Sequence, residues 1–177
     1  IEHIVYGGCH DNYNNIGAGF GFPVRFRIDV ADDPNFQSGV TTIVDHTQAD
    51  VVNPGVVPQI TTVGGRAARF VRVTATKLAP RQNDYIFALA ELRVLGADGK
   101  NLAAAGEVTS LDSIEAPPRW RRDNLVDGYF YRSQTDDDLA EMAAVQKSRD
   151  AILAAVLDET IQREAPDIDR RLGTVST

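Results

Sequence analysis

Two polar loops of the sequence carry the side chains best suited to holding a ligand. One loop reads HDNYNN and the other RQNDY. Each combines an aromatic ring, which can stack on the apolar face of a sugar, with planar groups that can bond adjacent hydroxyls. Loops often carry binding residues, although Asn-rich turns also occur for structural reasons alone. The side chains expected to form a carbohydrate site are His10, Asn12, Tyr13, Arg81, Asn83 and Tyr85.

No residue pattern in the sequence is typical of a catalytic site. The three histidines, His3, His10 and His46, lack the spacing of a zinc-binding helix, and no nucleophile elbow is present. Cys9 and His10 are adjacent, but neighbours on a strand point to opposite faces, whereas a thiol and its base must converge. We therefore expect the chain itself not to be an enzyme and Cys9 to be a buried or loop cysteine.

The stretch GAGFGF, residues 17–22, resembles a phosphate-binding loop only in its glycines. A dinucleotide fingerprint requires a third glycine where Phe22 stands, and a helix must follow it. Pro23 and an alternating apolar and polar run follow here, which predicts a strand. We expect these glycines to let a loop turn sharply into that strand.

Composition excludes several classes of function. The chain has 177 residues, 43% of them hydrophobic, and a net charge of −7, most of it from residues 98–177. Nucleic acids and anionic membranes are bound through basic side chains, so we expect neither partner. No apolar run approaches the ~18 residues of a membrane span. Because the chain begins at Ile1 and not at Met, we expect a processed or excised piece of a longer protein.

Short runs of branched and aromatic residues predict five strands, at residues 4–6, 24–30, 40–44, 70–76 and 87–95. Turn signals separate them without intervening helices, which favours an antiparallel β-sandwich over residues 1–97. Residues 98–134 read as an irregular segment with at most one strand. From residue 135 the apolar period becomes helical behind a run of acidic residues, so a helical appendage is expected over 135–177.

Three strand segments resemble the second half of a discoidin-type, or coagulation-factor type C, domain. They are PVRFRIDVADD, ARFVRVT and ALAELRV, and the later stretches GKNLA, LDSIEAPPRW and NLVDG resemble the opening of such a domain. The resemblance covers about residues 1–130. In the family, the stretch like NLVDG precedes the strands, whereas here it follows them, so the chain is either cut inside a domain or permuted.

The resemblance implies a galactose-binding-like jelly-roll fold and a ligand such as a glycan, a phospholipid or a protein. It also implies a structural calcium ion held by Glu91 and Asp127, the alternative for Glu91 being a strand residue paired with Arg72 or Arg93. Similar modules occur in large bacterial multidomain proteins and beside α-L-rhamnosidases, which implies secretion to the periplasm or the cell exterior and contact with neighbouring domains.

Together, the loops and the resemblance favour a non-catalytic carbohydrate-binding module. Two alternatives remain open: a structural or protein-interaction module, and an accessory part of a carbohydrate-active enzyme such as an α-L-rhamnosidase.

Overall fold

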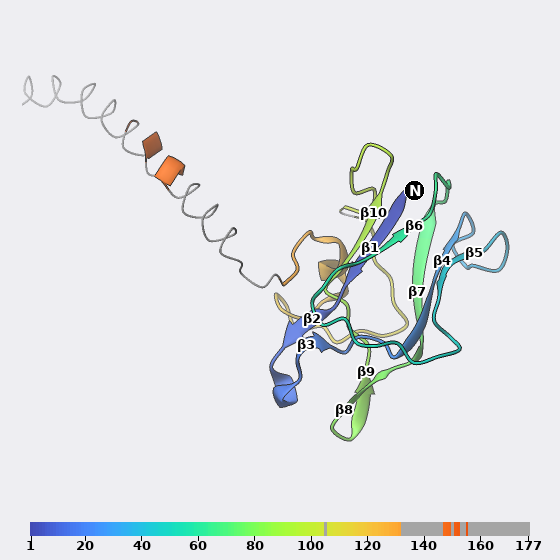
Figure 1. Ribbon diagram of the computed structural model, residues 1–177, viewed down its shortest axis with the longest axis horizontal. Helices are drawn as coiled ribbons and strands as arrows, with labels where there is room; N and C mark the ends of the chain where they lie inside the picture. The colour runs from blue at the N-terminus through green and yellow to red at the C-terminus, as the bar shows by residue number, and fades with distance from the viewer. Residues whose placement is uncertain (105, 132–146, 150, 153–154, 156–177) are drawn as a thin grey trace, which may run out of the picture. The chain divides into compact units, whose positions relative to one another are not determined.

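The chain divides into two compact units, Ile1–Arg132 and Ser133–Thr177. The computed structural model, shown in Figure 1, describes residues 1–104, 106–131, 147–149, 151–152 and 155. In the second unit, the six described residues are helical. The rest of the expected helical appendage, including its start at residue 135, lies outside the described residues.

The first unit is mainly β, with antiparallel sheets and few helices. One three-stranded sheet has the order β10 (Glu91–Leu95), β1 (His3–Gly7) and β6 (Gln59–Thr62). A second has the order β5 (Thr41–Asp45), β4 (Arg25–Ala31) and β7 (Phe70–Lys77). Two further pairs are β2 (Cys9–Asp11) with β3 (Gly17–Phe20), and β8 (Ala79–Arg81) with β9 (Asp84–Ile86). The short 3-10 helices are η1 (Tyr13–Asn15) and η2 (Arg122–Val126).

Both three-stranded sheets contribute to one hydrophobic core. Alternate residues of β4, among them Phe26 and Ile28, are buried, as expected for a strand with one face in the core. From β1, the Tyr6 ring meets Phe26 edge-on at 5.7 Å. Val44 of β5 and Leu92 of β10 belong to the same cluster. The alternation seen in the sequence therefore identified the face of β4 that enters the core.

The structure has a strand at each of the five predicted places, but one begins later than predicted and five short strands were not predicted. The strand expected over residues 87–95 begins only at Glu91. Before it, the N–H of Ala88 donates to the carbonyl of Gly21 in a turn, and the N–H of Ala90 donates to the carbonyl of Gly7 at the end of β1. The short strands β2, β3, β6, β8 and β9 were not predicted. Each has three or four residues, too few to show a period of two.

The glycine-rich stretch forms β3 and the turn after it. Gly17, Gly19 and Gly21 have φ values of 73°, 78° and 69°, where other residues are strained. A Cβ atom on Gly19 would overlap the side-chain amide of Asn53, and one on Gly21 would press on Ala88. These glycines thus allow a left-handed backbone and a close approach of two loops, and β3 is a strand where only a loop was expected.

Candidate functional site

Two of the predicted ligand-binding residues, one from each polar loop, meet in the fold. The guanidinium carbon of Arg81 lies 5.5 Å from the centroid of the Tyr13 ring, within the range of a cation–π contact. Tyr13 begins η1, and Arg81 ends β8, so both sit where the chain reverses direction. In Figure 1 the η1 turn and the β8–β9 hairpin lie at the same end of the unit. The Tyr13 side chain is 53% exposed, so a ligand can reach it.

Asp84 holds the Arg81 guanidinium in place. Nε and Nη2 of Arg81 donate to the two carboxylate oxygens of Asp84 at 2.9 and 2.5 Å. This bidentate pairing joins the two strand residues nearest the turn of the β8–β9 hairpin. The same contact holds the pKa of the Asp84 carboxyl below its usual range. Arg81 therefore presents an oriented planar donor group, which limits the side-chain freedom lost when a ligand binds.

The buried carboxylate of Asp11 fixes the position of Tyr13. Asp11 is 4% exposed, and its Oδ1 accepts the backbone N–H of Tyr13 at 2.8 Å. The other oxygen, Oδ2, accepts Nη2 of Arg119 at 2.5 Å. The sequence predicted neither role for Asp11 nor any for Arg119. The spacing of Asp11 two residues before Tyr13 is typical of an Asx turn and could have indicated the first contact.

A chain of aromatic rings leads from Tyr13 inward to the buried Phe20 and on to Trp120. The Tyr13 ring meets Phe20 edge-on at 6.4 Å, and Phe20 meets Trp120 edge-on at 5.3 Å. The Arg119 guanidinium lies 5.9 Å from the Trp120 ring. Trp120 and Arg119 come from the segment expected to be irregular, so no local sequence pattern could have placed them beside Tyr13.

The other four predicted ligand-binding residues do not join this contact. The His10 ring stacks on Tyr131 at 4.4 Å, and His10 points to the face of β2 opposite Asp11. Tyr85 pairs with Pro80 across the hairpin and points to the face opposite Arg81, with 71% exposure. Asn12 and Asn83 are exposed, Asn12 before η1 and Asn83 at the hairpin tip.

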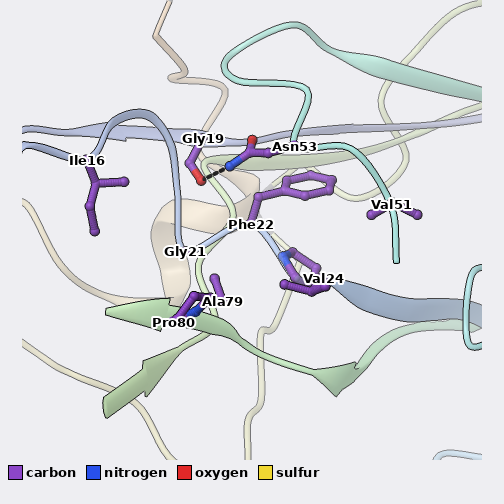
Figure 2. A pocket seen from close by; sticks show the side chains of 10 residues that line it. Ile16, Gly19, Gly21, Phe22, Val24, Val51, Asn53, Ala79 and Pro80 are labelled. Carbon is purple, nitrogen blue, oxygen red and sulfur yellow. Dashed lines mark hydrogen bonds between the residues drawn. The ribbon is translucent and has the colours of Figure 1, made fainter. Parts of the chain in front are cut away.

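A hollow of about 290 Å³, shown in Figure 2, is lined by residues that lie close in the chain to Tyr13 and Arg81. Its walls come from the glycine-rich stretch, from the start of β4, from residues 51–53 and from β8. The lining residues are Ile16, Gly19, Gly21, Phe22, Pro23, Val24, Val51, Asn53, Ala79 and Pro80. Most of these side chains are apolar, so the hollow suits an apolar group of a ligand.

The two residues implied as calcium ligands are close together. Glu91, on β10, is 3% exposed, and its Oε2 accepts the N–H of Gly128 at 3.2 Å. Burial raises the pKa of the Glu91 carboxyl, and the charge of neighbouring Asp127 adds to the rise. The other oxygen of Glu91, Oε1, is buried without a hydrogen-bond partner among the described residues.

Arg72 and Arg93, the two arginines considered as ion-pair partners of Glu91, differ in what they contact. Arg72 pairs with the buried Asp29 instead, at 3.5 Å, so that alternative is wrong. Arg93 lies near enough to Glu91 to lower the pKa of its carboxyl in part. The described residues contain no group of three or more His, Cys, Asp or Glu side chains able to hold a metal ion, so further ligands would have to be backbone carbonyls or water.

Cys9 lacks the environment of a nucleophile. Burial, with a smaller contribution from Asp11, raises the pKa of its thiol to about 12. A reactive cysteine needs a lowered pKa, usually from a cation or a helix N-terminus. Cys9 was expected to be buried or in a loop; it lies half-buried on β2. Within the described part of the chain, no helix has the length and apolar character that crossing a membrane requires.

Comparison with protein families, with curated proteins and with solved structures finds no match to this chain.

Proposed function

We propose that this chain is a non-catalytic carbohydrate-binding module whose site is centred on Tyr13 and Arg81. The observation that carries the proposal is the contact between these two side chains, which come from loops far apart in the sequence. A half-exposed ring beside an oriented guanidinium offers a stacking surface and paired donors together, which is the combination that sugars require. The buried Asp11 and the rings of Phe20 and Trp120 support the same surface.

The proposal includes a finer description of the fold. The two three-stranded sheets, which share one core, would be the halves of a β-sandwich of the discoidin type, with η1 and the β8–β9 hairpin as loops at one end. Such a module would serve a larger bacterial protein, in the periplasm or outside the cell, where polysaccharides are found. Neighbouring domains of that protein, including a carbohydrate-active enzyme, would be its other partners.

A structural calcium ion between Glu91 and Asp127 is a second part of the proposal. The unpaired buried Oε1 of Glu91 and the nearby Asp127 carboxylate are oxygen ligands of the kind that Ca²⁺ prefers, and a cation would relieve their mutual repulsion. Calcium that binds only the folded chain should raise its melting temperature. Glu91→Gln and Asp127→Ala should each remove that rise, and an unchanged melting temperature of the wild type at millimolar calcium would contradict the site.

A glycan array tests the binding proposal. The wild type should bind a defined subset of glycans, and Tyr13→Ala should lose that binding. Tyr129→Ala is the matched control, because Tyr129 is 82% exposed and takes part in neither the Tyr13 nor the Arg81 contact. Binding that survives Tyr13→Ala, or that Tyr129→Ala removes equally, would count against the proposed site, whereas a wild type that binds no glycan would favour a protein-interaction module.

A further inference from the structure

The hollow beside Tyr13 and Arg81 is built from the same segments that carry those residues. Ile16, in one wall, follows η1 directly, and its N–H donates to the carbonyl of Tyr13 at 3.2 Å. Ala79, in another wall, lies two residues before Arg81 on β8 and so shares its face of the strand. A sugar ring lying on Tyr13 and Arg81 would therefore have the hollow at its edge.

Two hydrogen bonds fix the walls of the hollow in position. The N–H of Val51 donates to the carbonyl of Val24 at 3.0 Å, which ties residues 51–53 to the start of β4. On the other side of the hollow, the side-chain amide of Asn53 donates to the carbonyl of Gly19 at 2.9 Å (Figure 2). The space of about 290 Å³ is at the lower end of ligand pockets, and so suits one small group and not a whole oligosaccharide.

The chemistry of the lining is apolar with one polar side chain. Of the ten described residues that line the hollow, Asn53 alone has a polar side chain. Its Nδ2 has two N–H bonds and uses one of them on Gly19, so it can donate the second to a ligand carbonyl. An acetamido group matches this lining, because it ends in a methyl group and carries a carbonyl oxygen.

We propose that the hollow receives the acetamido group of an N-acetylated sugar whose ring lies on Tyr13 and Arg81. The inference rests on the proposed carbohydrate site and names the class of sugar it selects. Water in an apolar hollow makes few hydrogen bonds, and its displacement by a methyl group favours binding. Burying one methyl corresponds to about a fourfold gain in affinity.

NMR titration of the chain with two matched pairs of sugars tests the selection. N-acetylglucosamine should bind at least about fourfold more tightly than glucose. The 6-deoxy sugar fucose should show no comparable gain over galactose of the same absolute configuration. Equal affinities within the first pair, or a gain confined to the second pair, would overturn the inference.

Filling the hollow provides the matched variants. Ala79→Leu and Val51→Phe enlarge two different walls, and each should abolish the preference for N-acetylglucosamine while leaving the affinity for glucose unchanged. Persistence of the preference in both variants would contradict the hollow as its origin. Tyr13→Ala should instead weaken both sugars, which separates the hollow from the stacking site.

N-methylacetamide tests the hollow without any sugar ring. It should shift the methyl resonances of Ile16, Val24 and Val51 in the wild type and not in Ala79→Leu. If no sugar binds while these shifts occur, the proposed carbohydrate function fails but the hollow still recognises an acetamido group. If N-methylacetamide shifts none of these resonances, the assignment of the hollow is wrong even where sugars bind.

Discussion

The side chain of Asn53 ties its own loop to β3: its Nδ2 donates to the carbonyl of Gly19, and its Oδ1 accepts the N–H of Gly55, both at 2.9 Å. Asn53 can approach so closely only because Gly19 has no Cβ atom. This contact explains the glycine-rich stretch in physical terms. The glycines allow the backbone to pack tightly beside the proposed site, and no phosphate group is needed to explain them.

Gly19→Ala should destabilise the fold through two effects. The left-handed φ of 78° would cost about 1–2 kcal/mol with a side chain, and loss of the Asn53 hydrogen bond would add about 1 kcal/mol. Gly39→Ala is the control, because Gly39 has a φ of 62° but open space around its Cβ position. Urea unfolding should show the larger loss for Gly19→Ala; equal losses would refute the role of Asn53.

Asp29→Ala should weaken the sheet formed by β5, β4 and β7. Asp29 is 1% exposed and accepts the hydroxyl of Thr42 at 2.7 Å, while Arg27 and Arg72 lie 2.9 and 3.5 Å away. Both arginine side chains are about 40% exposed and remain partly solvated, so we expect a loss of about 2 kcal/mol, below that for a fully buried pair.

The exposed Asp50 is the comparison for Asp29. It also pairs with two basic side chains, Arg25 and Lys77, but is 47% exposed. Asp50→Ala should therefore change the free energy of unfolding much less than Asp29→Ala. A similar loss for both variants in chemical denaturation would show that burial does not determine the strength of these ion pairs.

Cys9 should react slowly with thiol reagents in the folded chain. With a pKa of about 12, only about one thiol in ten thousand is ionised at pH 8, whereas an unperturbed thiol is substantially ionised there. Ellman's reagent should thus label Cys9 slowly in buffer and rapidly in concentrated urea. Equal rates in the two conditions would mean that the thiol is neither buried nor shifted in pKa.

Glu91→Gln should stabilise the calcium-free chain at neutral pH. Because burial raises the folded-state pKa of Glu91, the folded chain holds this proton more tightly than the unfolded chain. The contribution of Glu91 is therefore greatest below its ordinary pKa of about 4.3, and it is lost as the pH rises through the folded-state value. Glutamine retains an acceptor for the N–H of Gly128.

Melting temperatures of wild type and Glu91→Gln, measured with a chelator from pH 4 to pH 8, check this expectation. The gain for Glu91→Gln should be largest at pH 8 and should shrink toward pH 4. A gain that does not depend on pH, or a loss at pH 8, would show that the ionised carboxylate is not the unfavourable group.

The sequence predicted the longer strands because their alternation reflects burial. Phe26 and Ile28 alternate with charged residues along β4, and a single face of that strand lies in the core. The strands of the two hairpins were not predicted, because three or four residues are too few to show the alternation of apolar and polar residues. The residue types in the two loops indicated Tyr13 and Arg81 as ligand-binding residues. Their contact depends on the position of β8 relative to η1, which no local sequence pattern encodes.

The same limit applies to the surroundings of the site. Arg119 reaches Asp11, and Trp120 reaches Phe20, only through the folded arrangement of segments far apart in the sequence. His10 was grouped with Tyr13, and Tyr85 with Arg81, because each pair shares a loop; yet the His10 ring stacks on Tyr131, and strand alternation turns Tyr85 away from Arg81. Sequence proximity thus predicted the chemistry of the loops better than the direction of each side chain.

Amide NMR spectra recorded with and without a glycan retained on the array test the central claim most directly. The account predicts shifts confined to residues 12–24, 51–53 and 79–85, with binding near the millimolar level, about −4 kcal/mol. Tyr13→Ala would remove about 1 kcal/mol of stacking and abolish most of the shift. Retention of no glycan by the wild type, or shifts confined to the outer face of β4 and β7, would contradict a carbohydrate site at Tyr13 and Arg81.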